Sequence, residues 1–301
     1  MKITTTYLRQ VIKEELEAVI SEKANPEEVD PKRFPMKLSQ VDKDTAAANV
    51  KTGSEKYDEM ASDDSIPVAA ASIPVKDLKP SQSSMNIGKA LGMAISMINK
   101  SGPFKGGPGG NLGAFISNDN YIMDGHHRWI ASFMVDPNAE VGGYIVDFPR
   151  EELIAVLNTM TKGAFGVDTG KAASGGFDQF KPVPLKAALE AFIEKGNEFT
   201  KPEEVLNAVE TFTGKKGAAA VEAAAGKFSE NLAAATLSVP SGSPERPDMP
   251  VIDSKNVAKA VEMLTQGTVD VNKPYGDVEI KTEPENTNES IVYDRLKKLL
   301  K

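Results

Sequence analysis

The sequence predicts an α/β (α+β) protein in which a small domain of strands and helices, residues 66–160, precedes a mainly helical region, residues 161–275. Two observations predict this fold class. Up to about residue 160, short apolar runs of strand length alternate with apolar patterns of helical period. Beyond it, helical patterns follow one another. The 301 residues, 40% of them hydrophobic, suffice for one large or two modest domains.

Composition excludes several classes of function. The net charge is −8 and cysteine is absent, which excludes disulfides, thiolate catalysis and Cys-ligated zinc. No long block of Lys and Arg gives a broad footprint for nucleic acid. No run approaches the ~20 apolar residues of a membrane span. Charges within the first helical pattern argue against a signal peptide. We therefore expect a soluble, cytoplasmic protein with no membrane partner.

The two ends of the chain each contain an amphipathic pattern. Residues 1–25 are expected to contain an N-terminal helix, with its apolar stripe between Leu8 and Ile20. This helix would either dock onto the protein itself or tether a partner. Residues 26–65 are expected to be a disordered linker, because they hold few large apolar residues. Residues 276–301 are expected to form a polar linker and a short C-terminal helix.

The small domain is expected to alternate strands and helices. A strand at residues 73–75 precedes a helical pattern and a Gly/Pro loop, and a polar turn joins the next two strands. The expected strands are 73–75, 112–116, 121–123 and 141–148, and the expected helices are 85–99, 126–135 and one that starts at Pro149.

The region after residue 160 is expected to be helical. A Gly-rich stretch, residues 161–181, reads as a loop, and a Pro-rich hinge, residues 240–250, precedes the last helix of this region. The expected helices are 184–196, 201–213, 216–237 and 254–266.

The clearest functional signal lies at Asp124-Gly125-His126-His127-Arg128. The chain has two histidines, and they are adjacent in this segment. A strand, a glycine turn and a helix N-terminus together present free backbone N–H groups and the positive end of the helix dipole to an anion. Arg128 can add a two-pronged contact to phosphate oxygens. A carboxylate repels a bare phosphate, so Asp124 is better suited to hold a divalent cation or accept a proton.

Simpler interpretations compete with this one. Asp-Gly before a helix is commonly a turn with an N-cap, which would make Asp124 structural. Adjacent helical positions point about 100° apart, so His126 and His127 are poorly placed to ligate one metal together. Trp129 is expected to be a core residue rather than a stacking platform for a ligand.

The order of these segments resembles the ParB/sulfiredoxin superfamily over residues 66–150. The stretch Ile-Pro-Val-Lys-Asp-Leu-Lys-Pro at 73–80 and the Asp-Gly-His-His-Arg box carry the resemblance. It implies a mixed-sheet domain whose Gly-x-x-Arg turn binds the phosphates of a nucleotide. Gly125, His126, His127 and Arg128 would then bind phosphate, and Asp124 would lie beside the transferred group or a metal.

Members of this superfamily include CTP-hydrolysing DNA-partition clamps, ATP-using sulfinic acid reductases, free-serine kinases and ParB-like nucleases. Three features of the chain depart from them. The lack of cysteine excludes sulfiredoxin chemistry. Ser81-Gln82-Ser83 stands where the serine kinases have an acidic residue. The helices of residues 184–237 are not basic, unlike a DNA reader. The short terminal helices resemble those of proteins encoded by large tailed bacteriophages, which implies phage proteins as partners and the virion as an alternative location.

Three functions follow from the sequence. The first is a nucleotide-dependent phosphotransferase or hydrolase that uses Mg²⁺ and ATP, ADP or CTP. Asp124 would position the metal or acceptor, and His126 or His127 would transfer a proton near neutral pH. The second is a metal-dependent ParB-like nuclease acting on DNA, with Asp124 and His126 activating water. The third is a non-catalytic phage assembly or virion-associated protein.

Overall fold

A computed structural model describes residues 35–54, 64–170, 175–196 and 201–271. The helices expected at the two ends, within residues 1–25 and 276–301, lie outside the described residues. Five strands form one sheet: β1 (Val68–Pro74), β2 (Lys79–Pro80), β3 (Gly110–Ser117), β4 (Tyr121–Asp124) and β5 (Glu140–Val146). The helices are α2 (Lys43–Ser54), α3 (Ile87–Ile98), α4 (His126–Val135), α5 (Arg150–Gly163), α6 (Pro182–Lys195), α7 (Pro202–Thr213), α8 (Gly217–Leu232) and α9 (Val257–Thr265).

The sheet is mixed, and its strand order is β1-β5-β3-β4-β2. The pairs β1–β5 and β3–β4 are antiparallel, whereas β3–β5 and β2–β4 are parallel. The expected α/β class is therefore confirmed. A parallel pair of strands needs a crossover connection. For β3 and β5, the chain passes through β4 and then α4 before β5 pairs with β3.

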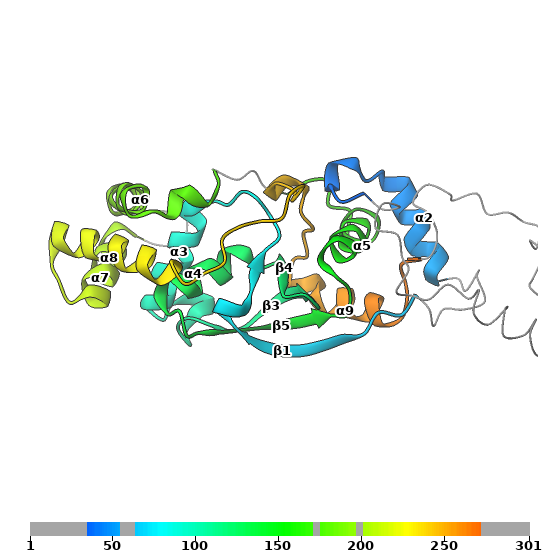
Figure 1. Cartoon of the computed structure of the whole chain (residues 1–301), viewed down its shortest axis with the longest axis horizontal. Helices are drawn as coiled ribbons and strands as arrows, with labels where there is room; N and C mark the ends of the chain where they lie inside the picture. Colours follow the sequence, from blue (N-terminus) through cyan, green and yellow to red (C-terminus); the bar gives the residue numbers. More distant parts are fainter. Residues whose placement is uncertain (1–34, 55–63, 171–174, 197–200, 272–301) are drawn as a thin grey trace, which may run out of the picture.

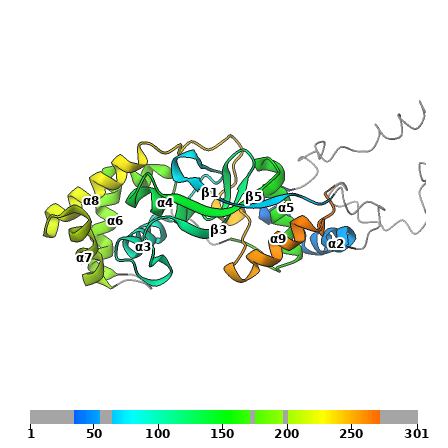
Figure 2. The same cartoon turned by 90° about the horizontal axis from the view of Figure 1, so that it is seen from below.

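Helices cover both faces of the sheet, because alternate residues of its central strands point to opposite sides. Ala114 and Ile116 of β3 belong to a core shared with α3, α4 and α6–α8. Phe115, between them, belongs to a second core shared with α5 and α9. Figure 1 shows the resulting elongated molecule, with α6–α8 at one end and α2 and α9 at the other. Figure 2 shows the same separation from below.

The described helices of the region 161–275 belong to two separate cores. Helices α6, α7 and α8 extend the core on the α3–α4 side, whereas α9 packs with α5 on the opposite face of the sheet. Residues 240–250, expected to be a hinge, connect these two groups of helices and contain a short 3₁₀ turn, Arg246–Asp248. They form a strap along the molecule rather than a free hinge.

The prediction of a disordered linker at residues 26–65 is also partly wrong. Residues 35–54 contain a 3₁₀ turn, Leu38–Gln40, followed by α2, while residues 55–63 lie outside the described part. Leu38, Val41 and Ala46 are buried. Helix α2 packs so closely on α5 that a Cβ at Gly163 would lie 2.6 Å from the carbonyl of Ala46. Small residues make this contact, so the sequence shows no strong apolar stripe there.

No helix in the described ranges has both the length and the apolar character to cross a bilayer.

Candidate functional site

The β4–α4 turn has the strand, glycine and helix arrangement that the sequence predicts. Strand β4 ends at Asp124 and α4 begins at His126, with Gly125 between them at a φ of 106°. Residues with a side chain rarely adopt this conformation. A Cβ at Gly125 would also lie 3.2 Å from Cβ of Ala114. Glycine is therefore required at this position both by backbone conformation and by the closeness of β3.

Asp124 is not the N-cap of α4. Gly125 holds that position, and no side chain caps the helix. One carboxylate oxygen of Asp124 instead accepts the N–H of Gly125, at 2.9 Å. The alternative interpretation of Asp124 as a helix cap is therefore wrong, although the residue does stabilise the turn itself.

The two histidines point in different directions, as adjacent helical positions should. The Nε2 atom of His126 accepts the backbone N–H of Ser81 at 3.1 Å, and Nε2 of His127 accepts that of Asn86 at 3.1 Å. Both side chains are buried. Together they attach both ends of the 81–86 loop, which leads from β2 to α3, to the start of α4. Each Nε2 would have to give up this bond to ligate a metal.

Both histidines are held in the neutral form. Burial lowers the pKa of His126 well below its ordinary value of 6.5, and repulsion from Arg246 and from the protonated form of His127 lowers it further. Burial, followed by the charges of Lys89, Arg246 and Arg128, lowers the pKa of His127 to about 3. A proton carrier near neutral pH needs a pKa close to 7. In this structure the two neutral rings accept hydrogen bonds, and their expected catalytic role stays a prediction.

The positive charges of three side chains from separate segments act on His127. Lys89 is the third residue of α3, Arg128 is the third residue of α4, and Arg246 comes from the strap. Sequence reasoning found Arg128 and missed the other two. A signal existed for Lys89, because a cation in the first turn of a helix opposes the helix dipole. No sequence signal connected Arg246 with this turn.

The arrangement offers little to a metal bound by protein alone. Among the described residues, no group of three or more His, Cys, Asp or Glu is placed to hold a metal ion. Asp124 is half-buried and is the acidic member of the turn. Magnesium often binds one or two carboxylates and completes its coordination with substrate phosphates and water. A metal at Asp124 would therefore depend on a phosphate ligand.

Trp129 is a core residue, as expected. It is fully buried, and its indole N–H donates to the carbonyl of Val75 at 2.8 Å. Its ring also meets that of Phe133 edge to face, with 6.2 Å between ring centroids. Trp129 thus anchors α4 against the segment after β1.

No protein-family model, curated protein or solved structure matches this chain.

Proposed function

We propose that the protein binds the phosphate groups of a nucleotide at the β4–α4 turn. The observation that carries the proposal is the placing of Lys89 and Arg128 at the third position of α3 and α4, beside His127. That position normally favours an acidic residue, since the N-terminus of a helix is already positive. A bound anion at these two neighbouring helix starts would meet both cations and the positive ends of the two helices.

The backbone of the turn supports the same ligand. No side chain caps α4, and within the described part of the chain no acceptor takes the N–H of His126 or His127. Uncapped amides at a helix start bind phosphate well, and Gly125 allows close approach. The resemblance of this turn to the Gly-x-x-Arg phosphate turn of the ParB/sulfiredoxin superfamily agrees with this assignment.

The proposal gives the remaining residues different tasks. His126 and His127 hold the 81–86 loop, and with it the start of α3, against α4. Asp124 would meet the phosphates through Mg²⁺, because two negative groups repel each other without a cation between them. A bound phosphate would also offset the charges of Lys89, Arg246 and Arg128, and so would raise the pKa of His127 above its value in the free protein.

Calorimetric titration of the full chain with ATP, ADP and CTP, with and without Mg²⁺, tests the proposal. Arg128→Gln should weaken nucleotide binding roughly tenfold or more, because a charge-assisted contact is lost. Lys255→Gln is the matched control. Lys255 is exposed, and its substitution removes one positive charge away from the site. Binding should be unchanged in the control. Equal affinity of wild type and Arg128→Gln would reject the site.

The same samples separate binding from turnover. Release of phosphate from ATP or CTP would identify a nucleotide-dependent enzyme, and cleavage of plasmid DNA with Mg²⁺ or Mn²⁺ would identify the nuclease. Nucleotide binding without either reaction would favour a non-catalytic function. If the wild-type protein binds no nucleotide, the proposed function is rejected and only the description of the fold stands.

A further inference from the structure

The strap of residues 240–250 lies against the loop that the two histidines hold. The N–H of Ser83 donates to the carbonyl of Pro244 at 3.0 Å, and the N–H of Arg246 donates to Oγ of Ser84 at 3.1 Å. The opposite ends of the same loop, Ser81 and Asn86, donate to the histidine rings. The 81–86 loop is therefore bonded to the α4 turn through the histidines and to the strap through its two central serines.

Arg246 adds its charge to this turn from a segment distant in sequence. Its backbone N–H bonds to Ser84 in the loop that the histidines hold, and its positive charge contributes to the lowered pKa of both histidines. Within the described part of the chain, no carboxylate lies within ion-pair distance of Arg246. Its Nη1 atom lies 3.2 Å from the position that a Cβ would take at Gly170. A side chain at Gly170 would therefore crowd the guanidinium.

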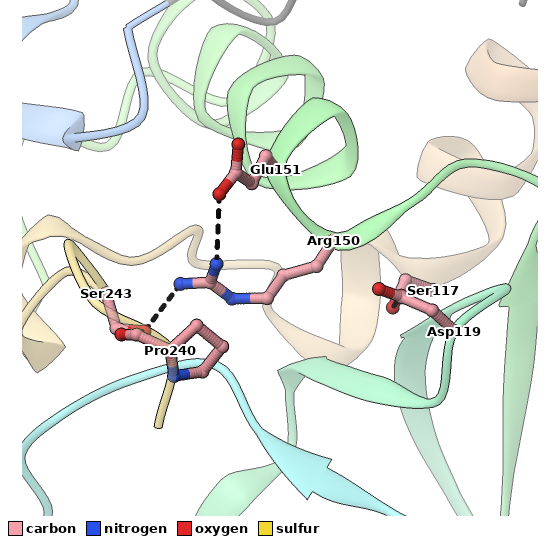
Figure 3. Close-up of polar contacts among 6 residues, drawn as sticks. All are labelled: Ser117, Asp119, Arg150, Glu151, Pro240 and Ser243. Carbon is pink, nitrogen blue, oxygen red and sulfur yellow. Dashed lines mark hydrogen bonds and ion pairs between the residues drawn. The ribbon is translucent and has the colours of Figure 1, made fainter. Parts of the chain in front are cut away.

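A buried arginine holds the strap in this place. Arg150, the first residue of α5, is only 3% exposed. Its Nη2 donates to Oγ of Ser243, which itself donates to the carbonyl of Pro240 at 2.7 Å. Figure 3 shows the guanidinium between Ser243 and Glu151, whose carboxylate is 3.5 Å from Nη1. Nε has no hydrogen-bond partner among the described residues.

Among the contacts of the buried Arg150 guanidinium, the one with the strap is the closest. Glu151 is 54% exposed on its side chain, and its separation of 3.5 Å is long for an ion pair. The ring of Tyr121 adds a cation–π contact at 5.6 Å. A buried charge needs close partners to offset its desolvation, and the hydroxyl of Ser243 is the closest that the described residues provide. The contact fixes the strap three residues before Arg246.

We propose that Arg246 is a third phosphate-binding residue of the α4 site, and that Arg150 positions it by anchoring the strap at Ser243. This inference rests on the proposed function. It also narrows the ligand class. Three cations from α3, α4 and the strap suit a chain of two or three phosphates, as in a nucleoside diphosphate or triphosphate, better than a single phosphate group.

Titration with inorganic triphosphate and with inorganic phosphate tests the role of Arg246. Arg246→Gln should weaken triphosphate binding roughly tenfold, the typical effect of losing one charge-assisted contact. It should change phosphate binding much less, and the exposed control Lys255→Gln should change neither. If Arg246→Gln binds triphosphate as wild type does while Arg128→Gln does not, the inference fails and the proposed function stands. If wild type binds neither triphosphate nor nucleotide, both fail.

A double-mutant cycle tests the role of Arg150. Arg150→Met should weaken triphosphate binding in the wild-type background and have no further effect in the Arg246→Gln background, because it acts through Arg246. Ser243→Ala removes the hydroxyl that Arg150 binds and should have the same effect on triphosphate binding. This variant provides the test if Arg150→Met does not fold. Additive losses in both cycles would show that the anchor does not act through Arg246, and would overturn that part of the inference.

Discussion

The turns at the starts of α4 and α5 bury ionisable side chains in opposite ways. Both turns lead from a strand into a helix, and the two helices lie on opposite faces of the sheet. At α4, each histidine Nε2 accepts a backbone N–H. At α5, Arg150 is equally buried, but its Nε has no partner in the described part of the chain. The buried histidine rings are therefore hydrogen-bonded through Nε2, whereas one nitrogen of the buried guanidinium has no such bond.

The histidine rings and the Arg150 guanidinium differ because only an imidazole can lose its proton near neutral pH. An imidazole that is buried among cations releases its proton and becomes a neutral acceptor, which is what the lowered pKa values of His126 and His127 describe. Burial also lowers the pKa of Arg150, with Glu151 opposing this effect, yet a guanidinium stays charged in proteins. The α4 turn therefore makes the stability of the fold depend on pH. The α5 turn instead keeps a buried charge whose Nε has no hydrogen-bond partner among the described residues.

The largest expected effect is the loss of stability in mild acid. The neutral form of His127 contributes fully above its unfolded pKa of 6.5, and that contribution is lost as pH falls towards its folded pKa of about 3. Linkage gives about 1.4 kcal/mol per pH unit for one such proton, and His126 acts in the same direction. The free energy of unfolding, measured with denaturant at pH 7, 6 and 5, should fall accordingly. The slope should be smaller in His127→Gln, and an equal slope would show that His127 is not the cause.

Replacement of the glycine in the α4 turn should have the next largest effect. Gly125→Ala places a side chain at a φ of 106° and 3.2 Å from Cβ of Ala114. We expect a loss of about 1–3 kcal/mol in the free energy of unfolding. Gly226→Ala is the control, because Gly226 lies in α8 with open space around its Cβ position, and alanine should stabilise that helix slightly. Similar melting temperatures for Gly125→Ala and wild type would contradict the strained turn.

Replacement of the buried arginine should have the smallest effect on stability. Arg150→Met keeps an apolar stem, and its former partner Glu151 is largely exposed, so no buried charge is left without a partner. We expect the free energy of unfolding to change by less than about 1 kcal/mol, or to rise, since apolar replacements of buried charges are often neutral or stabilising. Denaturant titration provides the measurement. A loss of several kcal/mol would mean that Arg150 is essential to the core as well as to the strap.

Features that depend on local chemistry could be predicted from the sequence. The α4 turn follows from a strand, a glycine and an apolar helix in succession, and the burial of Trp129 follows from its place on that helix. Most helices lie close to their expected ranges. Period and turn chemistry are local properties, and residues near in sequence express them without help from the rest of the chain.

Contacts between segments that are distant in sequence could not be predicted and depend on the folded structure. It placed α6–α8 and α9 on opposite faces of the sheet, ordered α2 against Gly163, and brought Arg246 to the α4 turn. It also determined the protonation state of the histidines, because their neutral form depends on burial by the whole domain and on charges from three segments. A pKa and a docking surface depend on distance in space, and no pattern of neighbouring residues encodes that distance.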